Sequence, residues 1–212
     1  MPSINSVSAF AALAFALIVV PGPSVMFVVS RAVSLGRRAA LVTVLGNAVG
    51  VFAQVVLVAI GVGAIVERSI AVFTAVKLLG AGYLVWLGIQ AIRHRRDASM
   101  ALTASVEVRS QRGVFADGFI VGVANPKAIV FFAAILPQFV EPAGAPASLQ
   151  MLLLGVVFVI VAVLSDGMWG LAAGTARDWF ARSPKRLERL GAAGGTVMVG
   201  LGLQLAGTGH DN

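Results

Sequence analysis

Six apolar runs, each long enough to cross a lipid bilayer, follow one another along this chain. A membrane-crossing helix needs about 20 residues, because it rises about 1.5 Å per residue through a hydrocarbon core about 30 Å thick. The runs span residues 7–30, 39–66, 70–92, 113–140, 149–172 and 190–209. This pattern predicts an all-α integral membrane protein with six transmembrane helices, arranged as two halves of three helices each.

The composition places these runs in a membrane rather than in the core of a soluble protein. Hydrophobic residues make up 58% of the 212 residues, charged residues only 12%, and the mean hydropathy is +0.94. Soluble domains average about 25% charged residues. No polar stretch is long enough for a separate soluble domain, so we interpret residues 1–212 as a single membrane domain.

Several classes of function are disfavoured by what the sequence lacks. The chain has no cysteine, and its two histidines, His94 and His210, belong to no cluster with metal-ligand spacing. We therefore expect no metal, no cofactor and no enzyme activity. The net charge of +7 does not indicate nucleic-acid binding, because the charges lie between the apolar runs instead of along one basic face.

Positive charges are concentrated in alternate connections between the runs. The connections after the first, third and fifth runs hold three, five and five Lys or Arg residues, thirteen of the sixteen: Arg31, Arg37, Arg38, Arg93, Arg95, Arg96, Arg109, Arg112, Arg177, Arg182, Lys185, Arg186 and Arg189. Cytoplasmic loops carry the Lys and Arg excess, so both termini are expected outside and the basic 93–112 loop inside. No Lys or Arg precedes the first run, which favours a retained helix over a signal peptide.

Proline interrupts the first helix of each half. Pro21-Gly22-Pro23 breaks the first run, and Asn125-Pro126-Lys127 breaks the fourth, where Pro126 leaves the Gly122 carbonyl without its helical partner. With three spans each, the halves 7–92 and 113–209 run through the membrane in opposite senses. Paired interruptions in inverted halves point to a transport site near the midplane, although proline also serves merely to bend membrane helices.

A few polar side chains inside the runs are candidates for function. The ionisable ones are Lys77, Asp117, Lys127 and Asp166. Counted along the helices, the two lysines lie roughly 21 to 22 Å from the inner edge and the two aspartates roughly 6 to 9 Å from it. Asp117 is equally well explained as an acid near a helix N-terminus, and Lys77 as a structural partner. Asn47 and Gln54 share a helix face, which suits either interhelical hydrogen bonds or substrate contact.

Pairs of glycines four residues apart recur in the runs, among them Gly46 with Gly50 and Gly118 with Gly122. This spacing lets helices approach closely. We expect such pairs to serve packing within one bundle, while a homodimer face stays open as an alternative.

Several of these motifs together resemble the lysine exporter (LysE) family, and within it the homoserine and threonine exporter (RhtB) branch. They are Pro21-Gly22-Pro23, the segment GNAVG at 46–50, Lys77 with GAGYLVWLG at 80–88, and above all DGFIVGVANPKAIVFFAAILPQFV at 117–140. The resemblance covers almost the whole chain. It implies an inner-membrane exporter of amino acids or related small metabolites, driven by proton exchange.

Our hypothesis is that this protein is a secondary active exporter, and the alternative is a passive channel or pore. Its partners are a small-molecule substrate, protons and the lipid bilayer. We expect Pro21, Gly22, Pro23, Asn47, Asn125, Pro126 and Lys127 to bind substrate where the broken helices meet, with Lys127 attracting a carboxylate. Asp166, with Asp117 and Lys77 as further members of a charge network, is expected to couple transport to protons.

Overall fold

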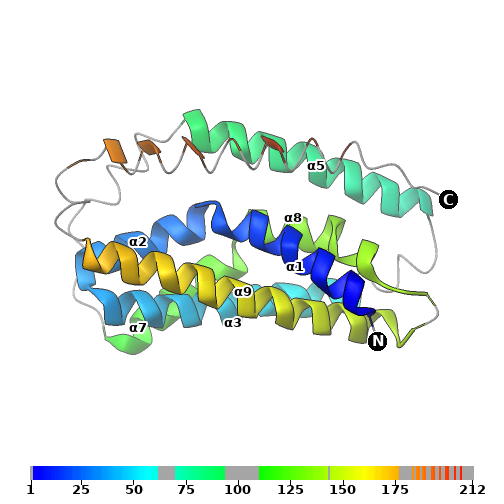
Figure 1. Cartoon of the computed structure of the whole chain (residues 1–212), viewed down its shortest axis with the longest axis horizontal. Coiled ribbons are helices and arrows are strands. Elements are labelled where there is room, and N and C mark those ends of the chain that lie inside the picture. The colour runs from blue at the N-terminus through cyan, green and yellow to red at the C-terminus, as the bar shows by residue number, and fades with distance from the viewer. Residues whose placement is uncertain are drawn as a thin grey trace.

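The computed structural model describes residues 2–61, 70–93 and 110–176 except 143, together with single residues and pairs between 183 and 206. The described residues form seven α-helices and one 3-10 helix, and no strand occurs among them (Figure 1). The helices are α1 (Ile4–Val19), α2 (Pro23–Leu35), α3 (Arg37–Gly61), α5 (Ile70–Arg93), α7 (Gln111–Val123), α8 (Pro126–Ala134), the 3-10 helix η1 (Leu136–Phe139) and α9 (Ala147–Thr175). The predicted loop at 94–109 and most of the sixth run lie outside the described residues.

The helices follow the apolar runs closely. α3 and α9 are each long and apolar enough to cross a membrane, and the described chain provides up to four crossings if each bent pair of helices counts as one. The bent pairs are α1 with α2, at 53°, and α7 with α8, at 44°. The two interruptions predicted from proline are therefore confirmed, and the chain is an all-helical membrane protein over its described part.

Proline determines how each second helix begins. Pro23 and Pro126 occupy the first turn of α2 and α8, where a missing N–H costs nothing and a fixed φ favours the helix. Asn125 caps α8, because its side-chain oxygen accepts a hydrogen bond from the Lys127 N–H at 3.1 Å. The Gly122 carbonyl, expected to lose its partner, accepts the Asn125 N–H at 3.2 Å instead.

The first half and the second half run in opposite directions where both are described. In Figure 1, α1–α2 runs from right to left and α7–α8 from left to right. α3 packs against α7, α9 and α2, while α9 also contacts α1 and α2. α5 lies along the top of the view and contacts α8. This arrangement brings α1, α2, α3, α8 and α9 around one central region.

Glycines bring α3 and α7 into backbone contact. A Cβ added at Gly46 or Gly50 would clash with a carbonyl oxygen of α7, and one added at Gly118 or Gly122 would clash with a carbonyl oxygen of α3. The four glycines thus form one reciprocal interface. The expectation that they pack helices within a single bundle is confirmed.

An aromatic cluster fills the part of the core that joins α1, α8 and α9. Phe131 contacts Phe10, Phe132 and Phe158, with ring centroids 5.4 to 5.9 Å apart. All four rings are buried. Offset and edge-on ring contacts of this kind add to the stabilisation from burial. The cluster fixes α8 against α1, and so fixes where Lys127 points.

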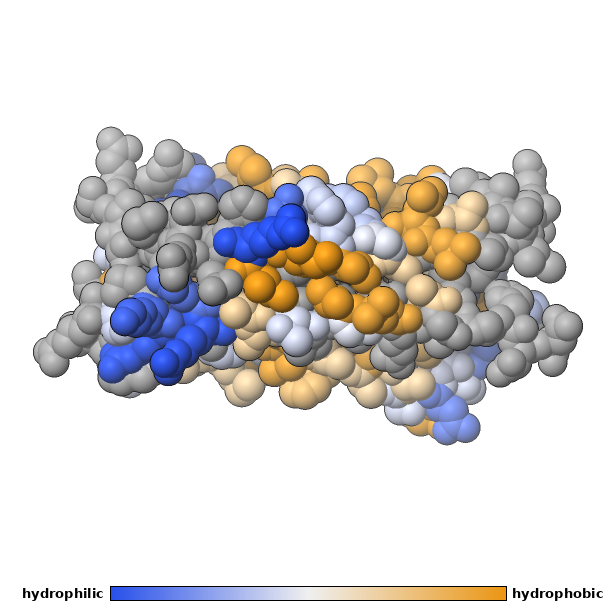
Figure 2. Space-filling view, turned by 90° about the horizontal axis from the view of Figure 1, so that it is seen from above, coloured by the Kyte–Doolittle hydropathy of each residue, from blue (hydrophilic) through white to orange (hydrophobic). Residues whose placement is uncertain are grey.

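The lateral surface is apolar and the ends are polar. Large hydrophobic side chains are exposed on several helices, among them Leu57, Ile60, Ile160, Leu164 and Met168. Figure 2 shows orange, hydrophobic side chains across the middle of the molecule and a group of blue, hydrophilic ones at the left end. An apolar belt between polar ends is what a lipid bilayer requires.

A polar clasp fastens the start of α1 to the loop before α9. One carboxylate oxygen of Glu141 accepts hydrogen bonds from the Ser3 N–H at 2.8 Å and the Ser6 hydroxyl at 2.9 Å. Gln150 in turn bonds both the N–H and the carbonyl of Glu141. The hydrogen bonds from Ser3 and Ser6 lower the pKa of Glu141 below its ordinary value of 4.5.

Candidate functional site

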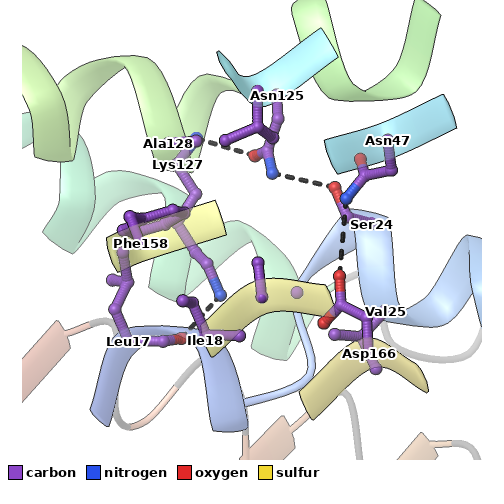
Figure 3. Close-up of a pocket in the computed structure, with 13 residues that line it drawn as sticks. Leu17, Ile18, Ser24, Val25, Asn47, Asn125, Lys127, Ala128, Phe158 and Asp166 are labelled. Carbon is purple, nitrogen blue, oxygen red and sulfur yellow. Dashed lines mark hydrogen bonds between the residues drawn. The ribbon is translucent and has the colours of Figure 1, made fainter. Parts of the chain in front are cut away.

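A small cavity of about 30 Å³ lies where the two broken helices meet. Its walls come from both interruptions and from α3 and α9 (Figure 3). The lining residues are Leu17, Ile18, Gly22, Ser24, Val25, Asn47, Val51, Asn125, Lys127, Ala128, Phe158, Ala162 and Asp166. Five residues predicted for the site or its charge network, Gly22, Asn47, Asn125, Lys127 and Asp166, are therefore brought together by the fold.

The two interruptions are joined by hydrogen bonds. The Asn125 side-chain amide donates to the Ser24 hydroxyl at 2.8 Å, which links the start of α8 to the start of α2. The Gln54 amide on α3 donates to the carbonyls of Val123 at 2.7 Å and Asn125 at 3.1 Å. Gln54 thus supplies a donor to the Val123 carbonyl at the end of α7, and adds a second donor to the Asn125 carbonyl, which also accepts the Ile129 N–H of α8 at 3.2 Å.

Lys127 binds the end of the other broken helix. Its ammonium donates to the carbonyl oxygens of Leu17 at 2.8 Å and Val20 at 3.1 Å, and the residue is only 6% exposed. These carbonyls are at the C-terminal end of α1, the negative end of the helix dipole, where a cation is favourable. A side chain at Gly22 would press on the ammonium, since its Cβ would lie 3.0 Å from Nζ.

Asp166 forms the opposite wall of the cavity. It is 3% exposed, and its Oδ2 accepts a long hydrogen bond of 3.4 Å from the Asn47 amide. The other carboxylate oxygen and the Asn47 carbonyl oxygen are buried without a hydrogen-bond partner. The sequence placed Asp166 within about 9 Å of the inner end of its apolar run, and α9 continues to Thr175, nine residues or about 14 Å beyond Asp166.

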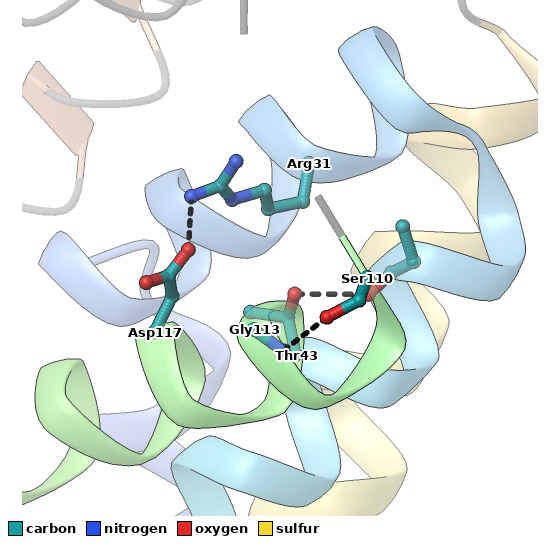
Figure 4. A network of polar contacts seen from close by, with 6 residues as sticks. Arg31, Thr43, Ser110, Gly113 and Asp117 are labelled. Carbon is teal, nitrogen blue, oxygen red and sulfur yellow. Dashed lines mark hydrogen bonds and ion pairs between the residues drawn. The ribbon is translucent and has the colours of Figure 1, made fainter. Parts of the chain in front are cut away.

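Asp117 lies away from the cavity, in an ion pair with Arg31. The carboxylate accepts a hydrogen bond from the guanidinium at 2.9 Å (Figure 4), and the two side chains are 19% and 9% exposed. The guanidinium also lies over the Phe27 ring, 4.7 Å from its centroid. Arg31 is therefore a buried residue of α2, and counting it among the charges of a cytoplasmic connection is wrong. The pair joins α2 to α7.

The remaining predicted site residues play backbone roles or are undescribed. Pro21 is buried, Pro126 half-buried and Pro23 exposed, and none of the three lines the cavity. The Lys77 side chain lies outside the described residues. Sequence reasoning missed Ser24, although it directly follows the Pro-Gly-Pro motif. It also missed Trp169, whose indole N–H donates to the Val19 carbonyl at 3.3 Å.

The family of LysE-type translocators matches residues 15–209. The chain belongs to the LysE family. A homoserine/homoserine lactone efflux protein of Salmonella typhimurium is 32% identical over 190 residues, which cover 90% of each chain. The threonine efflux protein of Escherichia coli K12 is 34% identical over 122 residues, 57% of this chain and 59% of the relative.

An uncharacterized membrane protein of Vibrio cholerae is 36% identical over 187 residues, 88% of this chain and 89% of the relative. No solved structure matches the chain. The resemblance to the homoserine and threonine exporter branch that the sequence motifs indicated is thus confirmed. Two of these relatives are named as efflux proteins, for homoserine and its lactone and for threonine, and the matching family model describes translocators.

Proposed function

We propose that this LysE-family protein is a secondary active exporter of amino acids or related small metabolites, and that it exchanges substrate for protons across the cytoplasmic membrane. The named relatives support the substrate class, because they are efflux proteins for homoserine, homoserine lactone and threonine. The proposed location of the transport site rests on the cavity between the two broken helices. The buried ammonium of Lys127 and the buried carboxylate of Asp166 form parts of its wall.

Transport requires the cavity to enlarge. A volume of about 30 Å³ has room for one or two water molecules, whereas pockets for small-molecule ligands are commonly ten times larger. In our proposal this narrow conformation is the closed one, and substrate enters when the halves separate on one side. The interruptions are the natural hinges, because the helices bend there by 53° and 44°.

Opposite charges on the cavity walls suit a zwitterionic amino acid. In our proposal Asp166 takes up a proton in one conformation and releases it in the other, so that its charge biases which side opens. Lys127 holds the end of α1 in the closed conformation and is available to the substrate carboxylate when the cavity opens. Asp117 and Arg31 fasten α2 to α7 and are placed outside the proton path.

The topology belongs to the same proposal: six spans in two inverted halves, both termini outside, and the 93–112 loop in the cytoplasm. Tags at the N-terminus and at residue 144 should be reached by an impermeant label from outside. A tag at residue 100 should be reached only after the membrane is opened. Labelling of an N-terminal tag from the cytoplasmic side would contradict the inverted halves.

The transport proposal is tested by a screen of labelled amino acids, with homoserine and threonine first, in proteoliposomes that carry an imposed proton gradient. An exporter of this kind concentrates at least one of them against its gradient, and an uncoupler abolishes the accumulation. A passive channel would equilibrate the same compound without concentrating it, with or without the uncoupler. Transport of no amino acid at all would refute the proposed substrate class.

A further inference from the structure

The unpartnered polar atoms on the cavity wall are acceptors. Asn47 Oδ1 and Asp166 Oδ1 are both buried without a hydrogen-bond partner, and both residues line the cavity. The orientation of the Asn47 amide is fixed, because its nitrogen donates to the other oxygen of Asp166. Turning the amide over would place its oxygen against a carboxylate. Gln54 and Ser165 also carry unpartnered oxygens, but neither lines the cavity.

Two of the side-chain donors on the cavity wall, the Lys127 ammonium and the Asn125 amide, already have partners. The Lys127 ammonium bonds two carbonyls of the α1 end, and the Asn125 amide donates to the Ser24 hydroxyl. Figure 3 shows Lys127 and Asp166 on opposite sides of the cavity. Buried acceptors without partners are unfavourable, so a ligand that brings several N–H donors gains most at this wall.

The charges on the surrounding helices agree with a cationic ligand group at this wall. Asp166 is the one ionisable residue of α9, and neither α1 nor η1 carries an ionisable side chain. The arginines of α3 are exposed in its first turn, and Arg31 of α2 pairs with Asp117. Lys127 is thus the described cation that shares the cavity with Asp166, and it is held on the far wall.

We propose that Asn47 Oδ1 and Asp166 Oδ1 form the seat for the substrate's primary ammonium group, and that this group is the obligatory recognition element whereas a free carboxylate is dispensable. The inference rests on the proposed transport of amino acids and adds a rule for selectivity. Amino acids whose carboxyl group is esterified bind, because they keep the ammonium. Compounds in which the ammonium is acylated or replaced by a hydroxyl do not.

The test is a competition series on the purified, detergent-solubilised protein with labelled threonine as the probe, so that membrane permeation of the competitors plays no part. Threonine methyl ester should compete within about tenfold of threonine. N-acetylthreonine and 2,3-dihydroxybutanoate should compete at least about 100-fold more weakly, because both lack the ammonium with its charge and three N–H donors, and a site built for such a group rejects analogues without it. The series needs no variant and does not depend on any variant folding.

Two variants connect the selectivity to the named residues. Asn47→Leu should weaken the binding of threonine and of its methyl ester by the same factor, because both compounds bind through the ammonium. Lys127→Met should weaken the binding of threonine more than that of the ester, because only threonine has a free carboxylate for the Lys127 ammonium. Competition by N-acetylthreonine or by the hydroxy acid within tenfold of threonine, or a methyl ester that fails to compete, would overturn the inference while leaving amino-acid export intact. A protein that neither binds nor transports any amino acid would refute both proposals.

Discussion

Removing the hydrogen bond between Asn125 and Ser24 tests whether the two helix interruptions stabilise each other. Ser24→Ala removes the acceptor, and in membrane proteins such an interhelical hydrogen bond contributes about 0.6 to 1.7 kcal/mol. Asn125→Ala removes the same bond and also the cap of α8, which contributes about 1 kcal/mol more. The single variants should therefore lose about 1 and about 2 kcal/mol of stability.

The double variant measures the bond itself. Because both single substitutions remove the same hydrogen bond, the double variant should be less destabilised than their sum by about 0.6 to 1.7 kcal/mol. Stability is measured as the free energy of unfolding by sodium dodecyl sulfate in mixed micelles, followed by circular dichroism. Ser8→Ala is the matched control, since the Ser8 hydroxyl is exposed and bonds within its own helix. Additivity within about 0.3 kcal/mol would show that the bond does not join the two breaks.

Three further predictions concern the scaffold around the site. Gly122→Ala should destabilise the protein by about 1 to 3 kcal/mol in the same unfolding assay, because its Cβ has no room against α3; Gly82→Ala, where nothing lies within 4 Å, should not. Arg31→Met should cost about 1.5 to 3 kcal/mol by removing the charge-assisted hydrogen bond to Asp117, and adding Asp117→Leu should restore part of the loss. Because the pKa of Glu141 is lowered in the folded protein, its clasp stabilises the fold above pH 4.5, and this stabilisation is lost as the pH falls below that value. Glu141→Gln should therefore remove the corresponding fall of the melting temperature at acid pH in a thermal denaturation series. A pH profile that the variant leaves unchanged would count against the clasp.

The spans and their interruptions were predictable because their causes are local. Apolar length sets where a helix crosses a membrane, and a proline without an N–H sets where it breaks. The reciprocal fit of Gly46, Gly50, Gly118 and Gly122 follows from small residues on one face of each helix. The meeting of Asn125 and Lys127 with Gly22 was predictable from the inverted halves, since equivalent breaks in such halves lie at one depth.

The partners of individual side chains were not predictable, because they depend on how the bent helices pack. Lys127 was expected to attract the carboxylate of a substrate, or a neighbouring acid when no substrate is bound. In the structure its ammonium bonds the carbonyls at the end of α1 instead of a neighbouring acid, because the bend after Val20 exposes these carbonyls. Arg31 was counted as a loop charge because it follows an apolar run. Its partner Asp117 lies 86 positions away in the sequence, and only the contact of α2 with α7 reveals why a charge is buried there.

The helix that carries Asp166 is longer than its apolar run predicted. The apolar run predicted that the fifth span ends at residue 172, whereas α9 continues to Thr175 and its glycines pack against α2 and α3. The Asp166 side chain shares the central cavity with Lys127. This position strengthens the case for Asp166 as the proton-carrying residue and weakens it for Asp117.

The proton-carrying role proposed for Asp166 is tested by comparing the parent protein with Asp166→Asn in proteoliposomes. The amide keeps the size of the side chain and one acceptor oxygen but cannot carry a proton. We predict that Asp166→Asn binds substrate more weakly, because it loses the charge at the proposed ammonium seat, and that it fails to accumulate labelled substrate under an imposed proton gradient. Exchange of labelled for unlabelled substrate should remain measurable at higher substrate concentration. Asp117→Asn, away from the cavity, should keep proton-driven accumulation. If Asp166→Asn still concentrates substrate at the parent rate, Asp166 is a packing residue and the proton path lies elsewhere in the protein.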